Sequence, residues 1–226
     1  MKPAHFIALL APALLAPEAL AQVPAVAAHA LQLRSGDAIS RSKSARALGA
    51  LGESARSAVP ALVRALGDAD PFVARDAVEA LGKIGRGAVP ELVQALRHPA
   101  VAVRSRALMA LGRIGPKDKS AVRAAVRALG DKEVDVRRWA AVALDRMGVA
   151  GEGAVPALVL ALRDEDLTVR VSAAVALGSL GADAREAASP LTSLLKEGNS
   201  EKLPAAAGKA VRKHTSALGP AEHRPR

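Results

Sequence analysis

The sequence predicts an all-α fold, an α-solenoid (superhelix) in which about six helix hairpins stack in a row. The first observation is a recurring Ala-Leu step, whose leucines follow one another at intervals of 33, 30, 33 and 33 residues: Leu48, Leu81, Leu111, Leu144 and Leu177. A second series of leucines precedes the first by 15 residues in every unit: Leu33, Leu66, Leu96, Leu129 and Leu162. Third, 50% of the residues are hydrophobic but only 1% are aromatic. The core must therefore consist of small aliphatic side chains on closely packed elements, as in contacting helices.

One unit illustrates the two helices that we expect in each hairpin. Residues 59–66 place apolar side chains at helical spacing, and Pro60 suits the first turn of this helix A, where no amide donor is needed. Pro71 disfavours a helical residue before it, so helix A ends and helix B begins there. Gly82 and Gly85 are expected to end helix B. Its buried stripe consists of Val73, Ala77, Leu81 and Ile84.

The later units repeat the stripe of helix B at equivalent positions. The three expected stripes are Val103, Ala107, Leu111 and Ile114, then Val136, Ala140, Leu144 and Met147, then Val169, Ala173, Leu177 and Leu180. Length changes fall only in the connector after the second leucine, where the stretch from Ile84 to Val89 is three residues shorter than the stretch from Ile114 to Val122. Insertions confined to connectors are typical of loops between rigid units.

The repeated motif is Val-Pro-Ala-Leu-Val-x-Ala-Leu-x-Asp followed by Val-Arg-x-x-Ala-x-x-Ala-Leu-Gly, and residues 155–181 match it closely. This motif resembles HEAT repeats, specifically the short bacterial kind related to the phycobilin lyase HEAT-like family. The resemblance covers residues 26–214 and implies a right-handed, armadillo-like superhelix. The outer units depart from the motif, because residues 26–58 lack the proline and residues 188–214 lack the Leu-Gly close. Atypical terminal units are expected where the end of a stack faces water.

Charged residues recur in two columns, six residues apart. Asp131 precedes Arg137 and Asp164 precedes Arg170, whereas His98 and Arg104 occupy the same columns in an earlier unit. In HEAT repeats similar residues form a ladder of hydrogen bonds along the stack, and the resemblance implies that role here. The unit 59–88 has Ala74 in the arginine column, so we expect the ladder to be broken there.

The opposite stripe of each helix B is predicted to face solvent. It comprises, unit by unit, Asp76, Glu79 and Lys83, then Arg106, Met109 and Arg113, then Trp139, Val142 and Arg146, then Ser172, Val175 and Ser179. The resemblance places the second helices on the concave face, with a basic and partly apolar centre. The predicted partner-binding residues are Arg106, Met109, Arg113, Arg138, Trp139, Val142 and Arg146, because Trp and Arg are frequent anchors. The alternative for Trp139 is simple packing over a neighbouring helix.

The two ends of the chain differ from the repeats. Residues 1–21 have the three parts of a cleavable signal peptide, with Ala19 and Ala21 as the small residues before the cut. Pro3, Pro12 and Pro17 argue against a helix of the solenoid in this segment. We therefore expect a solenoid over residues 22–214 in a periplasmic or secreted protein with no membrane span, followed by a flexible basic tail over residues 215–226.

Nothing in the sequence indicates an enzyme, a cofactor or a metal site. The chain has no cysteine, and none of its five histidines forms a His-Glu pair or a His-x-x-x-His step. It also lacks a Gly-x-Ser-x-Gly nucleophile elbow and a Gly-rich phosphate loop with lysine. We expect a non-catalytic scaffold.

The expected partner is a protein, bound by a monomeric chain on its concave face. The net charge of +10 would attract an acidic protein surface, anionic lipid or nucleic acid, or would serve solubility alone. A solenoid that binds nucleic acid or another polyanion is the alternative, although few aromatic side chains are available for stacking on bases. A non-catalytic relative of HEAT-like lyase subunits is a further alternative, by family analogy only.

Overall fold

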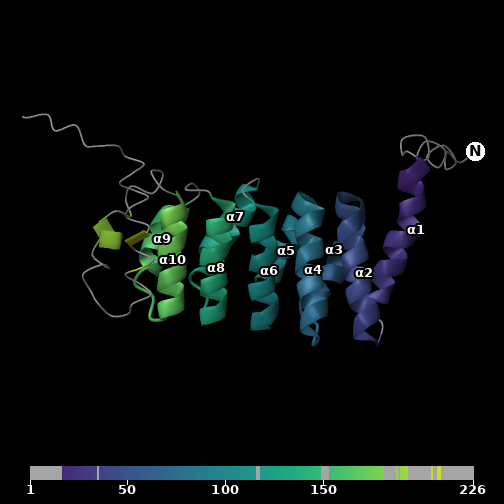
Figure 1. Ribbon diagram of the computed structural model, residues 1–226, viewed down its shortest axis with the longest axis horizontal. Coiled ribbons are helices and arrows are strands. Elements are labelled where there is room, and N and C mark those ends of the chain that lie inside the picture. Colours follow the sequence, from purple (N-terminus) through teal and green to yellow (C-terminus); the bar gives the residue numbers. More distant parts are fainter. Residues whose placement is uncertain are drawn as a thin grey trace, which may run out of the picture.

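The computed structural model confirms a solenoid of helix hairpins over the part of the chain that it describes. These residues are 17–34, 36–115, 118–148 and 153–180, with shorter pieces at 187, 189–192, 205, 208 and 209. Within them every regular element is helical, and the hairpins follow one another along a single row (Figure 1).

The helices form two layers. The A layer contains α3 (Val59–Ala65), α5 (Val89–Ala95), α7 (Lys119–Ala128) and α9 (Ala154–Ala161). The B layer contains α2 (Ala38–Leu51), α4 (Pro71–Ile84), α6 (Val101–Ile114), α8 (Val134–Met147) and α10 (Leu167–Leu180). The first helix, α1 (Pro17–Gln32), packs against α2, and the 3₁₀ helices η1 (Gly52–Ala58) and η2 (Gly85–Ala88) lead into α3 and α5. In Figure 1 the B helices stand side by side, so each expected helix B is confirmed.

The ends of the B helices follow from local sequence. Asp70 caps α4, because its carboxylate accepts hydrogen bonds from the amides of Phe72 and Val73, and Pro71 occupies the first turn. The helix ends at Gly85, whose φ of 75° is a left-handed value that favours glycine. Gly85 is thus confirmed as a helix end, but the prediction that Gly82 also ends the helix is wrong, because Gly82 lies inside α4.

Glycines inside the B helices permit close approach of neighbouring helices. A Cβ atom on Gly49 of α2 would lie 2.9 Å from Cα of Ala80 on α4, and one on Gly112 of α6 would lie 3.1 Å from Cα of Ala143 on α8. A Cβ atom on Gly82 would lie 2.9 Å from Cβ of Arg113. The glycine of the repeat therefore keeps adjacent B helices in close contact, a role that the spacing of glycines along the sequence did not reveal.

The predicted core is largely confirmed. All five leucines of the Ala-Leu step are buried, as are Leu33, Leu66 and Leu162 of the second series. Leu96, Leu129 and Ile114 are only half-buried and lie against the edge of the core. Each hairpin therefore buries its apolar stripe against its neighbours, which is how stacked repeats gain stability.

The charged ladder is confirmed as a series of ion pairs between successive units. Arg104 and Arg137 each hold an aspartate of the next unit through two hydrogen bonds, from Arg104 to Asp131 at 2.9 Å and from Arg137 to Asp164 at 2.7 and 3.0 Å. The same pair forms between Arg41 and Asp68. The arginines 104, 137 and 170 also donate to backbone carbonyls of their own A–B turns. Each of these arginines thus fixes its own A–B turn, and Arg104 and Arg137 also connect that turn to the next unit.

The ladder is interrupted between α4 and α6, as predicted. Both members of the expected pair are replaced, because Ala74 stands in the arginine column and His98 in the aspartate column of the next unit. Nδ1 of His98 still accepts from the amide of Ala100 at 3.1 Å, as the ladder aspartates do from the residue two positions later. His98 therefore preserves the turn but does not replace the ion pair.

The ladder carboxyls remain ionised at neutral pH. The hydrogen bond from Arg41 is the main reason that the pKa of Asp68 is lowered. Burial is the largest single influence on Asp131 and Asp164 and would raise their pKa values, but the arginine hydrogen bond, the backbone amide hydrogen bond and the nearby arginine charge together lower the pKa of both. Stability from these pairs is therefore fully present above the unfolded aspartate pKa of about 3.9 and is lost as the pH falls through the lower folded values.

At the N-terminus, α1 begins at Pro17 and continues through the predicted cut after Ala21. Val26 on α1 and Leu33 just after it are buried, and both would remain after removal of residues 1–21. Most of the predicted signal segment, and the predicted tail over residues 215–226, lie outside the described residues. Among the described helices, none is long and apolar enough to cross a membrane.

Candidate partner-binding face

The solvent-facing side of the B layer is named the B face here, and its residues recur at intervals of three and four along each helix. The B helices contact their neighbours in the row more extensively than the A helices do. The B face consists of Ile39, Lys43, Arg46, Phe72, Arg75, Glu79, Lys83, Ala102, Arg106, Met109, Arg113, Asp135, Arg138, Trp139, Val142, Arg146, Thr168, Ser172, Val175 and Ser179.

A basic cleft lies in the middle of the B face, where α4, α6 and α8 meet. It encloses about 380 Å³ and is named the central cleft; its lining residues are Glu79, Gly82, Lys83, Arg113 and Arg146. Arg113 forms an ion pair with Glu79 of the preceding unit. Three cationic side chains and one carboxylate thus line the central cleft, which carries surplus positive charge.

The two arginines are positioned by the glycines beneath them. The side chain of Arg113 passes directly over Gly82 of α4, and Cδ of Arg146 would lie 3.3 Å from a Cβ atom on Gly112 of α6. A larger residue at either glycine would displace these aliphatic stems. The repeat therefore aligns one arginine from each of two consecutive units along the same groove.

Trp139 and Arg138 form a second feature of the B face, on α8. The guanidinium carbon of Arg138 lies 4.8 Å from the centroid of the Trp139 ring, and Arg138 also pairs with Asp135 at 3.2 Å. Trp139 and Met109 are half-buried and pack against the core. The ring of Trp139 therefore packs over the core, as the alternative interpretation expects, and its role as a binding anchor stays a prediction.

Arg106 does not line the central cleft and extends toward the A layer instead. Its Nη1 donates to the carbonyl oxygen of Leu66 at 2.5 Å, at the end of α3 in the A layer. The small side chain of Ala74 leaves this end of α4 without the ladder arginine, and Arg106 supplies a guanidinium to the same A–B turn. Of the seven predicted partner-binding residues, the structure brings Arg113 and Arg146 together in the central cleft. Met109, Arg138, Trp139 and Val142 lie on the same face outside the cleft lining.

Asp76 was expected to face solvent on helix B, and that prediction is wrong because the residue is buried. The α2 helix covers it: Oγ of Ser42 donates to its carboxylate at 2.6 Å, and Arg46 lies 3.5 Å away. The exposed stripe of α4 instead passes through Phe72, Arg75 and Glu79.

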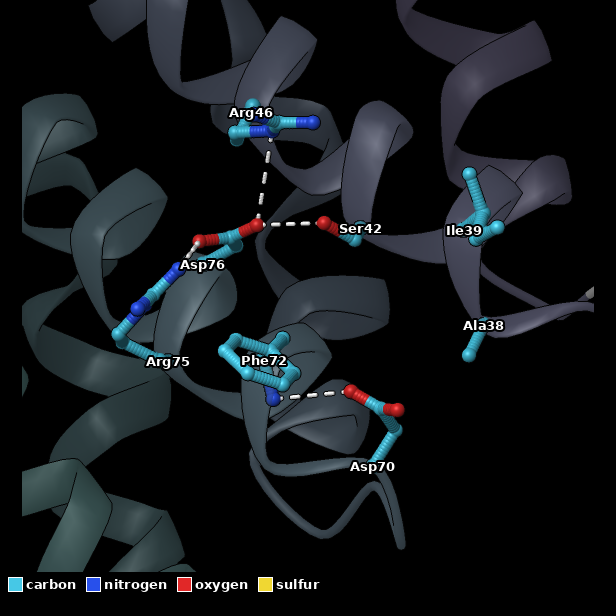
Figure 2. Close-up of a pocket in the computed structure, with 8 residues that line it drawn as sticks. All are labelled: Ala38, Ile39, Ser42, Arg46, Asp70, Phe72, Arg75 and Asp76. Carbon is cyan, nitrogen blue, oxygen red and sulfur yellow. Dashed lines mark hydrogen bonds and ion pairs between the residues drawn. The ribbon is translucent and has the colours of Figure 1, made fainter.

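A second hollow on the B face, between α2 and α4, was not predicted from the sequence. Figure 2 shows this α2–α4 pocket, which encloses about 320 Å³ and contains Asp76 with Ser42, Arg46 and Arg75 around its carboxylate. Ile39 and Phe72 contribute exposed apolar side chains to the same pocket. A usable signal was present in Phe72, one of the few aromatic residues of the chain, next to Arg75 at helical spacing.

Metal binding finds no support in the described part of the chain, where no group of three or more His, Cys, Asp or Glu side chains could hold an ion. The two-layered stack of repeats defines the class of the protein as an α-solenoid.

Family models identify the kind of repeat. A model for HEAT repeats matches residues 24–90 and 89–159, and a model for the PBS lyase HEAT-like repeat matches residues 169–197. The chain therefore belongs to the HEAT-repeat family. A search of curated proteins gave no match.

Solved structures with the same fold come from natural and designed proteins. The complex of CpcE and CpcF of phycocyanin lyase from Nostoc sp. PCC7120 matches with a TM-score of 0.62 at 24% identity, over 68% of this chain and 98% of that chain. A designed armadillo repeat protein in complex with the peptide (KR)4 matches with a TM-score of 0.56 at 21% identity, over 84% and 99%. An engineered protein matches with a TM-score of 0.53 at 24% identity, over 85% and 97%. At these identities the likeness concerns the fold.

Proposed function

We propose that this HEAT-repeat protein is an exported, non-catalytic scaffold that binds an acidic segment of a protein partner on its B face. The observation that carries the proposal is the central cleft, whose lining contains the cationic side chains of Lys83, Arg113 and Arg146 but only one carboxylate, that of Glu79. Arginine side chains held at fixed positions are suited to carboxylates, because their guanidinium groups can donate two parallel hydrogen bonds.

The structural relatives support a binding role. One of them is a complex between two proteins, and another is a designed solenoid in complex with a basic peptide. The central cleft of this protein would repel a basic peptide, because most of its charged lining residues are cations. An acidic partner is therefore the complement that we assign to it.

The proposal that the protein is exported rests on its N-terminal segment and not on its fold. Residues 1–21 combine a basic start, an apolar stretch and small residues before the cut. A chain processed after Ala21 keeps the whole B layer and the buried Val26. Cell fractionation followed by mass measurement of the mature chain tests this part, and a full-length chain retained in the cytosol would refute it.

The binding role is tested with a defined acidic peptide, capped at both ends, and fluorescence anisotropy. We expect the double substitution Lys83→Gln and Arg146→Gln to weaken binding by roughly tenfold, since both side chains line the central cleft. The matched control is Arg64→Gln with Arg163→Gln, which removes the same charge from exposed positions off the B face. Equal losses in both variants would indicate plain charge attraction and would refute a specific site.

Duplex DNA of equal charge serves as the competing probe. A nucleic-acid binder would bind DNA more tightly than the peptide at every salt concentration, whereas attraction by net charge falls steeply with added salt. Retention of the peptide preference at moderate salt supports the protein-binding role.

A further inference from the structure

The α2–α4 pocket combines a buried ion cluster with exposed apolar groups. The Asp76 side chain, only 7% exposed, accepts a hydrogen bond from Ser42 and lies 3.5 Å from Arg46 and 3.4 Å from Arg75. The side chains of Arg46 and Arg75 are 64% and 61% exposed. Two cations therefore share one carboxylate, and both guanidinium groups reach solvent at the mouth of the pocket.

These guanidinium groups have capacity for a second anion. Each carries five N–H donors, and the contact of Arg46 or Arg75 with Asp76 is made through a single nitrogen. The contacts at 3.4–3.5 Å are also longer than the 2.7–3.0 Å pairs of Arg41 and Arg137 in the ladder. Asp70 also lines the pocket, but its carboxylate caps α4 by accepting hydrogen bonds from the amides of Phe72 and Val73. Because the Asp76 side chain is buried and those of Arg46 and Arg75 are exposed, an incoming carboxylate would meet the two guanidinium groups first.

The apolar part of the pocket lies beside the two arginines. Ile39 on α2 is 68% exposed and Phe72 on α4 is 60% exposed, and both line the pocket. The Arg75 guanidinium lies 5.2 Å from the centroid of the Phe72 ring, so the apolar and cationic groups are adjacent (Figure 2). Large apolar side chains gathered in a hollow are typical of sites where a partner buries an apolar group.

We infer that the α2–α4 pocket is a second anchor for the same acidic segment, taking an apolar side chain and a neighbouring Asp or Glu side chain. This inference rests on the proposed function and adds to it a sequence requirement for the partner. We assign the carboxylate to an Asp or Glu side chain of the partner. A chain has one C-terminal carboxylate, whereas both the α2–α4 pocket and the central cleft must be filled.

The distance between the anchors sets the spacing in the partner. Arg75 and Lys83 lie on α4, and their separation in sequence corresponds to about 12 Å along the helix axis. The axes of neighbouring helices lie about 8–10 Å apart. A point midway between α2 and α4 is therefore roughly 14 Å from α6. The combined distance of about 18 Å equals five to six residues of extended chain at about 3.3 Å each.

The test uses a synthetic peptide, acetylated and amidated, with a Leu-Glu pair and a Glu-Glu pair separated by about five Gly or Ser residues. Binding to the full-length chain is measured by anisotropy. We expect Phe72→Ala combined with Arg75→Gln to weaken binding by roughly tenfold. The matched control, Leu160→Ala combined with Arg64→Gln, changes an exposed apolar and a basic residue on the A layer and should alter binding by less than about twofold.

Peptide variants identify the chemistry. Replacing Leu by Gly in the peptide should abolish the effect of Phe72→Ala, and replacing the first Glu by Gln should abolish the effect of Arg75→Gln. A peptide that lacks internal acids but has a free C-terminus should bind weakly. If it binds as tightly as the designed peptide, the assignment to a side-chain carboxylate is wrong.

The two proposals fail separately. Unchanged binding in the Phe72/Arg75 variant, with a loss in the Lys83/Arg146 variant, overturns the second anchor and leaves the proposed function intact. Unchanged binding in both overturns both. Far-UV circular dichroism and the unfolding midpoint of each variant confirm that a loss of binding is not a loss of fold, as expected for exposed side chains.

Discussion

Two contacts between consecutive B helices differ in the side chains that stabilise them. We call them the α6–α8 joint and the α4–α6 joint. In the first, Arg104 holds Asp131 of the next unit by two hydrogen bonds and also ties down its own turn. In the second, Ala74 and His98 occupy those positions, the contact between the helices is less extensive, and Arg106 donates to the carbonyl of Leu66 instead. The second joint also follows the shortened connector, η2.

The difference shows that the apolar stripe and the ladder contribute separately. Burial of the leucine stripe continues through both joints, so the solenoid does not need the ion pair to continue. The ion pair fixes the A–B turns of consecutive units relative to each other, because Arg104 and Arg137 each bind both their own turn and the next. The α4–α6 joint lacks the ion pair. It lies between the α2–α4 pocket and the part of the central cleft that α6 and α8 contribute.

The largest expected effect comes from Leu111→Ala, which would damage both joints at once. Leu111 is fully buried on α6, the helix that the two joints share. Truncation should lower the free energy of unfolding by about 2–5 kcal/mol, because it removes apolar contact and leaves a cavity. Urea denaturation measures the change. As a control, Leu160→Ala at an exposed site should change stability by less than about 0.5 kcal/mol.

Much of this comparison could be predicted from the sequence, for physical reasons. The period of the leucines specifies which faces are buried, and the columns of Asp131 and Arg137 already indicated the ladder and its gap at Ala74. Periodicity does not say which way a side chain at the boundary of the stripe turns. Asp76 was therefore misplaced, and the bond from Arg106 to an A-layer turn could not be anticipated.

The role of the glycines was hidden for a similar reason. Gly82 lies within the last turn of α4, so its position suggested helix termination. The function of Gly82 and Gly112 depends on the distance to the next B helix, which no local pattern contains. The α2–α4 pocket also depends on tertiary contact, because its residues come from α2 and α4.

A second, intermediate effect sharpens the comparison between the joints. Arg137→Ala should lower the free energy of unfolding by about 3 kcal/mol, because it leaves the carboxylate of Asp164, which is only 10% exposed, without its cation. Arg106→Ala, at the joint without the ladder pair, removes a single hydrogen bond to a carbonyl and should cost only about 1 kcal/mol. Thermal and urea unfolding of the two variants decide the point, and equal losses would mean that the ladder pair adds nothing to the joint.

The smallest expected effect comes from restoring the missing pair with Ala74→Arg and His98→Asp in the Arg106→Ala background. The background removes the guanidinium that now serves this turn. An aspartate at position 98 can accept from the amide of Ala100, as Asp131 does from that of Glu133. Ala74→Arg alone should destabilise the protein, since Ala74 is fully buried and an isolated charge there has no partner.

Together the two changes should recover about 1 kcal/mol of coupling in a double-mutant cycle, measured by urea unfolding at neutral pH. The coupling should be complete above the unfolded aspartate pKa of about 3.9 and should be lost as the pH falls through the lower pKa of the paired carboxylate, because that carboxylate must be ionised. Coupling near zero at neutral pH would show that the spacing of α4 and α6 prevents the pair from forming. The short connector, and not the two missing side chains, would then be the cause of the difference between the joints.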